Sequence, residues 1–133
     1  MIYTLDTNII SYLVRGDKAV IQRWRSERTQ GNKSVIPIIA CYEAKRGLLA
    51  ANATKKLNDF EELCSVLGVE DLSRDDADTA SRIYAELKGK GRMSGDGDIL
   101  IAAQALSRGY TLVTNNIKHF KDIDGLLFEN WVE

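Results

Sequence analysis

The segment DILIAAQALSRGYTLV, residues 98–113, decides the fold class of this chain. Residues 98–106 are apolar on nearly every side of a helix, so we expect a buried helix that ends at Gly109. Residues 110–113 are aromatic, β-branched or apolar and predict a short strand. A buried helix that leads into a strand is typical of a parallel sheet covered by helices.

The same alternation of strand and helix patterns extends over the rest of the chain. Further short strands are predicted at 2–5, 35–38, 69–72 and 126–128. Helices are predicted between them, with starts at Asp6 or Thr7, at Asp17, near Cys41, at Thr54, and at Ser73 or Asp75. Such alternation favours right-handed crossovers, parallel pairing and helices on both faces of the sheet. The pattern predicts an α/β fold, and 133 residues suit a single domain over 1–133.

Composition excludes several classes of protein. Hydrophobic residues make up 44% of the chain, which indicates a packed core rather than a disordered chain. There is no run of about 18 apolar residues and no basic stretch ahead of an apolar one, so we expect neither a membrane span nor a secretory signal. The two cysteines, Cys41 and Cys64, are expected to be reduced, buried thiols in a cytoplasmic protein.

Charge is segregated along the chain although the formal net charge is only −1. Residues 15–33 carry a net charge of +4 and residues 70–78 a net charge of −4. Local basic patches bind phosphate groups even on a neutral protein, so a nucleic-acid partner is not excluded. The alternative interpretation is that these residues form solvated helix faces.

Three acidic residues lie at or near predicted strand-to-helix or helix-to-strand junctions: Asp6, Glu43 and Asp98. Each has a structural interpretation: Asp6 as a helix N-cap, Asp98 as a favourable charge at a helix start, and Glu43 as the partner of Arg46. Ligands of open parallel sheets bind outside the carboxyl ends of the strands. Three carboxylates that converge there repel one another unless protons or a divalent cation relieve the repulsion.

A carboxylate cluster without histidine or cysteine ligands favours Mg²⁺ or Mn²⁺ over zinc. Such ions suit phosphodiester hydrolysis because they lower the pKa of water and stabilise charge on phosphate oxygens. His119 is the only histidine, which excludes a mechanism with two histidines in one chain, and we interpret it as a surface or packing residue. Asp96 is interpreted as a helix cap in preference to an outer-shell ligand.

Four ordered blocks of sequence are similar to a known family. They are LDTN at 5–8, YEAKRGL at 42–48, DILIAAQA at 98–105, and LVTNN at 112–116 followed by Phe120. These blocks resemble the PIN-domain family, and the ending GLLFENW at 125–131 resembles its VapC-type toxin branch. The resemblance extends from end to end of the chain, with the blocks in the order and at the spacing of the family.

The resemblance implies an α/β/α sandwich with a central, mainly parallel sheet of four to five strands. It also implies a metal-dependent endoribonuclease that is the toxin of a VapBC-type toxin–antitoxin pair and cuts loops of structured RNA such as tRNA or rRNA. Toxins of this type form homodimers, and a small VapB-type antitoxin that inserts into the active-site groove neutralises them. Water activated by Mg²⁺ or Mn²⁺ is expected to leave a 5′-phosphate without use of the 2′-hydroxyl.

The functional residues carry over position by position. Asp6, Glu43 and Asp98 match the metal-binding acids, and Asn116 matches a position where many members have a fourth Asp. Small polar residues that support the acids by hydrogen bonds are matched by Thr7, Asn8 and Thr114, with Asp96 as a further supporting candidate. Candidate contacts to the RNA backbone are Lys88, Lys90, Arg92 and Arg46.

Two other functions are alternatives to a nuclease. One is a non-catalytic PIN-like module that binds protein or nucleic acid, which the intact set of Asp6, Glu43 and Asp98 disfavours. The other is a receiver-type phosphotransfer domain. That class needs an acceptor Asp at the end of a central strand and a later Lys, and the sequence shows no convincing arrangement of this kind.

Overall fold

The computed structural model describes residues 1–132 and contains one five-stranded sheet in the order β3-β2-β1-β4-β5. All four pairs of neighbouring strands are parallel. The strands are β1 (Ile2–Leu5), β2 (Lys33–Pro37), β3 (Val69–Glu70), β4 (Thr111–Val113) and β5 (Leu127–Glu129). The predicted α/β class and parallel pairing are confirmed, and the third strand is shorter than the four residues expected.

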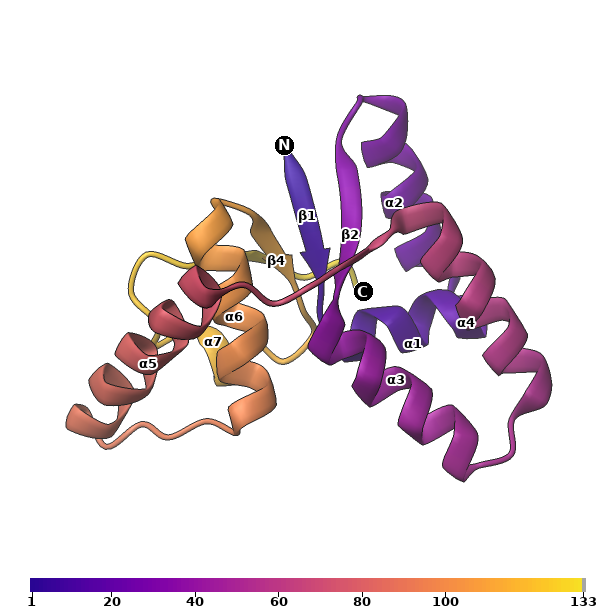
Figure 1. Cartoon of the computed structure of the whole chain (residues 1–133). Helices are drawn as coiled ribbons and strands as arrows, with labels where there is room; N and C mark the ends of the chain where they lie inside the picture. Colours follow the sequence, from indigo (N-terminus) through magenta and orange to yellow (C-terminus); the bar gives the residue numbers. More distant parts are fainter. Residues whose placement is uncertain (133) are drawn as a thin grey trace.

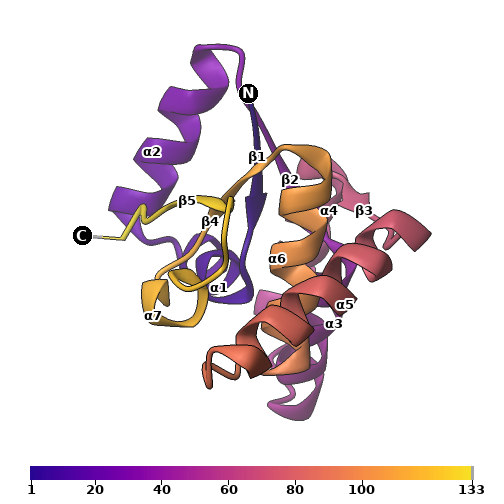
Figure 2. The same cartoon turned by 90° about the vertical axis from the view of Figure 1, so that its left-hand side faces the viewer.

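Helices cover the sheet from two sides. They are α1 (Thr7–Arg15), α2 (Lys18–Thr29), α3 (Ile38–Ala50), α4 (Thr54–Leu67), α5 (Arg74–Gly89), α6 (Asp96–Arg108) and the short α7 (Ile117–Phe120). Helices α1 to α4 lie on one side of β1 and β2, and the pair α5 and α6 lies on the other (Figure 1). In the turned view, the chain after β5 extends toward α2 (Figure 2). The three-layer sandwich that the resemblance implies is therefore present.

The strand order creates a switch point between β1 and β4. From β1 the chain moves outward to β2 and then β3, and α5 and α6 bring it back to β4 on the other side of β1. Adjacent strands whose connections leave in opposite directions open a crevice at their carboxyl ends. Asp6 directly follows β1 and Thr114 directly follows β4, so both residues lie at this crevice.

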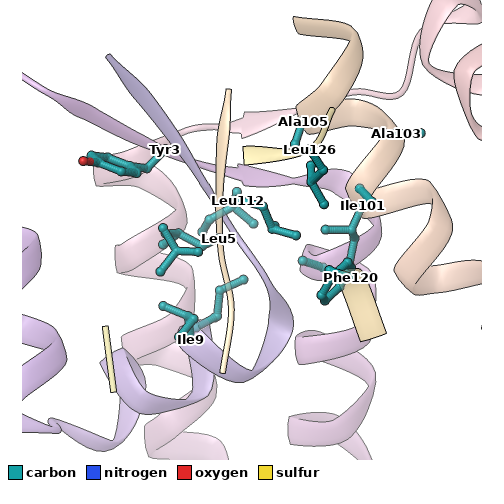
Figure 3. Packing of buried hydrophobic residues seen from close by; sticks show 14 of the residues in the cluster. Tyr3, Leu5, Ile9, Ile101, Ala103, Ala105, Leu112, Phe120 and Leu126 are labelled. Carbon is teal, nitrogen blue, oxygen red and sulfur yellow. The ribbon is translucent and has the colours of Figure 1, made fainter. Parts of the chain in front are cut away.

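The core lies between the sheet and the helices, and α6 is its most deeply buried helix. Ile101, Ala103 and Ala105 of α6 are all fully buried. Ile101 and Ala105 lie on the side of the helix that faces Leu112 and Phe120, whereas Ala103 lies on its far side (Figure 3). Gln104 is also buried, and its amide donates a 3.0 Å hydrogen bond to the carbonyl oxygen of Glu70. The helix predicted over 98–106 is confirmed as a core helix.

The start of α6 differs from the prediction. The helix begins at Asp96, its N-cap is Gly95, and no side chain caps it. The interpretation of Asp96 as a cap is therefore wrong, because Asp96 occupies the first helical position, where its exposed carboxylate can only complement the helix dipole. Asp6, in contrast, is the N-cap of α1 and accepts a hydrogen bond from the backbone amide of Thr7.

The basic segment 15–33 finds many of its partners inside the chain. Arg15 lies over the ring of Tyr12, and Arg28 lies over the ring of Trp24. Arg23 forms ion pairs of 2.8 Å with Glu27 and 2.7 Å with Glu129, which tie α2 to β5. Three of the six basic residues of this segment therefore have a partner within the chain, an aromatic ring or a carboxylate.

The two cysteines lie close together between α3 and α4, and neither is in a disulfide. Both are half-buried, which is less than the full burial expected. Burial, with the nearby Cys41 thiol, raises the pKa of Cys64 to about 12. At neutral pH Cys64 is therefore a thiol, not a reactive thiolate. Among residues 1–132, no helix is long and apolar enough to cross a membrane.

Candidate active site

Asp6 is the buried centre of the crevice between β1 and β4. Its side chain is only 3% exposed, and its two carboxylate oxygens accept three hydrogen bonds. Oδ1 accepts from the amide of Thr7 at 2.8 Å, and Oδ2 accepts from Thr114 Oγ1 at 2.8 Å and from Asn8 Nδ2 at 3.1 Å. Asp6 is therefore held in one orientation by residues that follow two neighbouring strands.

Glu43 reaches the same crevice from the second turn of α3. Its Oε1 accepts a 2.6 Å hydrogen bond from Thr7 Oγ1, so Thr7 contacts both acids. Its Oε2 lies only 2.6 Å from the position that a Cβ atom on Gly97 would occupy. A side chain at position 97 would displace Glu43, so this glycine lets the first turn of α6 approach the Glu43 carboxylate.

Asp98 lies in the first turn of α6 and is paired with His119. His119 Nδ1 is 2.9 Å from Asp98 Oδ2, and the Asp98 side chain is 26% exposed. His119 belongs to α7, which follows the Thr114–Asn116 turn after β4. The interpretation of His119 as a mere surface or packing residue missed this contact. The sequence did offer a signal for this contact, because His119 lies three residues after Asn116 and shortly after a strand that ends at the crevice.

The three acids influence one another electrostatically. Burial raises the pKa of Asp6, and the negative charges of Asp98 and Glu43 raise it further, against the lowering effect of the hydrogen bonds from Thr114 and Thr7. In their present rotamers Glu43 turns toward Thr7 and Asp98 toward His119. Within residues 1–132, no three His, Cys, Asp or Glu side chains meet closely enough to hold one ion together.

Asn116 is exposed at the rim of the crevice. Its backbone amide donates a 2.9 Å hydrogen bond to Thr114 Oγ1, the same hydroxyl that donates to Asp6. The neighbouring Asn115 amide donates to Asn8 Oδ1 at 3.1 Å. The segment after β4 is thereby tied to the start of α1, and the Asn116 side chain is left at the open edge.

Comparison with known proteins agrees with this geometry. Residues 3–126 match the PIN domain. The chain belongs to the PIN-domain family. It is 34% identical to the ribonuclease VapC2 of Rickettsia felis over 98% of each chain, and 33% identical to the tRNA(fMet)-specific endonuclease VapC of Shigella flexneri over 97% of each. The crystal structure of VapBC2 from Rickettsia felis bound to a promoter DNA fragment contains a similar chain, with a TM-score of 0.92 and 31% identity, over 99% of this chain and 100% of that one.

The donor chemistry of this PIN domain fits a hard divalent cation. Asp6, Glu43 and Asp98 offer only carboxylate oxygens, and the charges of Glu43 and Asp98 add to the effect of burial in raising the pKa of Asp6. A cation between them would remove that repulsion, and to reach it Glu43 and Asp98 would have to turn from their present partners, Thr7 and His119.

The candidate RNA-contact residues of this PIN domain divide into two groups. Lys90 is occupied, because its Nζ donates to the Asp122 carbonyl and to Asp124 Oδ1, both at 3.2 Å. Arg46 stacks on the Tyr42 ring and donates to its hydroxyl at 3.3 Å, so the Glu43–Arg46 pair is not formed. Lys88 and Arg92 are exposed, and of these two only Arg92 lines the hollow beside Asp98.

Proposed function

We propose that this chain is a metal-dependent endoribonuclease that acts as the toxin of a VapBC-type toxin–antitoxin system. The observation that carries the proposal is the buried carboxylate of Asp6 at the switch point, under the combined charge of Glu43 and Asp98. Two similar proteins are named as a ribonuclease and a tRNA endonuclease, and a similar solved chain belongs to a VapBC complex, which supports the proposal.

We assign the binding of Mg²⁺ or Mn²⁺ to Asp6, Glu43 and Asp98. Thr7, Asn8 and Thr114 hold Asp6 in place before any ligand arrives, so Asp6 itself needs no reordering when the site fills. A divalent cation held by these residues supplies a Lewis acid that lowers the pKa of water and neutralises charge on a phosphate. Asn116, at the open rim, would assist through a water bound to that cation, and Asp96 contributes only negative charge nearby.

The substrate we propose is a loop of structured RNA, in tRNA or rRNA. Proteins that recognise RNA mostly bind single-stranded loops, because unpaired nucleotides can unstack and bend into a crevice as a rigid stem cannot. The Shigella flexneri relative is named for tRNA(fMet), which makes a tRNA the first substrate to test. Action on such RNA implies a cytoplasmic location, in keeping with two cysteines that are not in a disulfide.

Metal dependence tests the proposal directly. With a structured tRNA transcript, we expect cleavage in Mg²⁺ or Mn²⁺, products with 5′-phosphate ends, and no cleavage in EDTA. The same ions should raise the melting temperature, since a ligand at a hundredfold excess over its Kd stabilises a protein by about 2.7 kcal/mol. Asp78→Asn, on the exposed face of α5, is the control and should respond like the unaltered chain.

Two results would decide against the nuclease. Cleavage that persists in EDTA would exclude the proposed role of the acids. Metal-induced stabilisation without turnover of any RNA would favour the alternative, a non-catalytic PIN-like module that binds protein or nucleic acid. Differential scanning fluorimetry and a gel assay on the same samples separate these outcomes.

We propose that a VapB-type antitoxin occupies the groove between α1, α3 and α4. This groove has a volume of about 300 Å³, is lined by apolar side chains such as Ile10, Leu48 and Phe60, and reaches Thr7 and Glu43 at the candidate site. The similar Rickettsia felis chain was crystallised in a VapBC complex, which supports a partner of this kind. An apolar segment seated here would block RNA from the acids.

Gly47 offers a test of the groove that spares the chemistry. It lies in the interior of α3 and lines the groove, and a Cβ atom there would meet nothing within 4 Å. We expect the leucine side chain of Gly47→Leu to fill the groove and to weaken antitoxin binding at least about tenfold, as measured by calorimetry. A tenfold loss corresponds to about 1.4 kcal/mol of binding free energy. RNA cleavage should be unchanged, and stability should stay equal or rise, since glycine is a poor helix former.

Ala50→Leu is the matched control for this experiment. It adds a leucine side chain to the same helix at an exposed position outside the groove. Antitoxin binding that is equal in both variants would place the antitoxin elsewhere.

A homodimer stays a prediction from the resemblance. Several large apolar side chains are more than half exposed and would be covered in an assembly: Tyr42, Leu49, Val66, Met93 and Leu127. Light scattering of the purified chain measures the mass that decides this point.

A further inference from the structure

A second hollow, distinct from the antitoxin groove, lies next to Asp98. It has a volume of about 470 Å³ and is bounded by residues 91–95 before α6 and by residues 118–122 in and after α7. Asp98 and His119 belong to its lining, so the hollow is continuous with the candidate metal site. This volume lies within the range of pockets that take a small ligand or one unit of a polymer.

The walls of this hollow are fastened to each other. Ser94 Oγ donates a 3.1 Å hydrogen bond to the His119 carbonyl. Lys90 Nζ donates to the Asp122 carbonyl and to Asp124, and the Arg92 amide donates to the Leu87 carbonyl at 2.8 Å. Two segments that lie 25 or more residues apart in sequence are thus joined by side-chain hydrogen bonds. The hollow is a built feature of the fold, and Lys90 serves it as a structural clamp.

Three cations line the hollow: Arg92, Lys118 and Lys121. All three are exposed, and within the described 132 residues none makes a side-chain hydrogen bond or ion pair, in contrast to Lys90 and Arg108. The lining also contains two carboxylates, Asp122 and Asp98, and Asp98 is already paired with His119. A chain with a net charge of −1 therefore presents a local excess of unpartnered positive charge beside its candidate catalytic edge.

We propose that this hollow, called here the basic pocket, binds the RNA backbone next to the scissile bond. Arg92, Lys118 and Lys121 contact phosphates of the nucleotides on one side of the cut, while Asp98 marks the position of the cut itself. The proposal rests on the proposed nuclease function. It assigns the backbone contacts to α7 and the loop before α6 rather than to Lys88, Lys90 and Arg46, which lie outside the pocket lining or have partners.

RNA is favoured as the occupant because of continuity and chemistry. The pocket opens onto Asp98, and a strand that places a phosphate at the acids must run its neighbouring phosphates past the adjacent surface. Unpaired lysine and arginine side chains recognise backbone phosphates without regard to base sequence, as a single strand in a loop requires. The antitoxin is assigned to the apolar groove, so its binding at the basic pocket is a competing outcome of the test.

The test measures RNA binding separately from catalysis. The full chain is titrated into a fluorescein-labelled single-stranded RNA of about 12 nucleotides. A single binding site covers only a few nucleotides, so an RNA of this length can span both the acids and the basic pocket. The titration is done in EDTA at several salt concentrations. We compare the unaltered chain with the triple variant Arg92→Gln, Lys118→Gln, Lys121→Gln. The matched control is Lys18→Gln, Arg25→Gln, Lys33→Gln, which removes the same charge from exposed positions outside the pocket.

The pocket variant should bind the RNA at least about tenfold more weakly. The slope of log K against log salt should fall by about 2, since each phosphate contact on a single strand contributes about 0.7. In the cleavage assay with Mn²⁺, KM should rise while kcat stays within about threefold. The reason is that the lost contacts would bind the ground state and the transition state equally. The control triple should keep the slope and should bind within about threefold of the unaltered chain.

Other results would contradict RNA binding at the basic pocket and leave the proposed nuclease function unaffected. Equal RNA affinity and slope in both triple variants, with normal cleavage, would show that the cations do not bind the backbone. Weaker antitoxin binding with unchanged RNA binding would assign the pocket to the protein partner instead. Single substitutions guard against loss of folding in the triple variant, and each should weaken binding by two- to threefold, about what one contact contributes. Absence of metal-dependent cleavage in the unaltered chain would count against the proposed function and not against the pocket.

Discussion

Asp98→Asn will lower the rate of RNA cleavage by at least about 100-fold and will leave the fold intact. Asparagine keeps the shape of the side chain but removes the charge that the proposed cation site needs. Loss of a group that only supports a metal ligand already costs about 10- to 100-fold, so loss of a ligand should reach or exceed that range. The measurement is the single-turnover cleavage rate of the tRNA transcript in saturating Mn²⁺.

The same variant should stop growth arrest when the chain is expressed, and its thermal midpoint without metal should be unchanged or higher. The reason is that one of the two charges that raise the pKa of Asp6 is removed. Asp78→Asn, the same substitution at an exposed surface pair, should cleave and arrest growth normally. Full cleavage by Asp98→Asn would refute the assignment of this residue to the site.

Asp76→Asn should destabilise the protein by about 3 kcal/mol, the low end for breaking a buried ion pair. Asp76 is 1% exposed and joins the start of α5 to the end of α6. Its carboxylate accepts hydrogen bonds from Ser107 and from the Ser73 amide, and Arg108 Nη2 lies 2.7 Å from Oδ2. Urea unfolding should show a lower midpoint with an unchanged slope, and the melting temperature should fall by about 10 °C.

The stability that Asp76 contributes should depend on pH at low pH. Burial alone would raise its pKa, but the hydrogen bonds from Arg108, Ser107 and Ser73 outweigh burial and lower the pKa to about 2. Because the folded pKa lies below the unfolded value of about 3.9, Asp76 stabilises the fold above about pH 4, and this contribution is lost as the pH falls toward about 2. The contribution is roughly 2 kcal/mol.

The free energy of unfolding of the unaltered chain should therefore drop more steeply than that of Asp76→Asn between about pH 4 and about pH 2. Asp78→Asn should follow the unaltered chain, because its carboxylate is more than half exposed and paired only with Arg74. Parallel curves for the unaltered chain and Asp76→Asn would show that Asp76 keeps an ordinary pKa.

Much of the fold could be predicted from local patterns. Ser73 caps α5 through a reciprocal capping box with Asp76, Gly109 ends α6 in a left-handed conformation, and the apolar residues of α6 are buried as expected. These features depend on hydrogen bonds and backbone preferences between residues close in sequence. The position of Asp6 was also predictable, because a residue directly after a central parallel strand must lie at the carboxyl edge.

The partners of individual charges were not predictable in this way. A Glu43–Arg46 pair was the structural alternative to a functional role for Glu43, but Arg46 stacks on Tyr42, and Glu43 accepts from Thr7, 36 residues away. His119 contacts Asp98 across a different junction. Helical spacing states which pairs are possible on one helix, and packing of separate helices decides which of them form.

The sequence by itself determined the order of strands and helices, the buried character of α6, and the presence of Asp6, Glu43 and Asp98 near junctions. These follow from periodicity and turn chemistry, which act over a few residues. Only the tertiary structure decided that Lys90 is a clamp, and that Lys118 and Lys121 join Arg92 beside Asp98. Long side chains select partners by distance in space, and that distance exists only after the chain has folded.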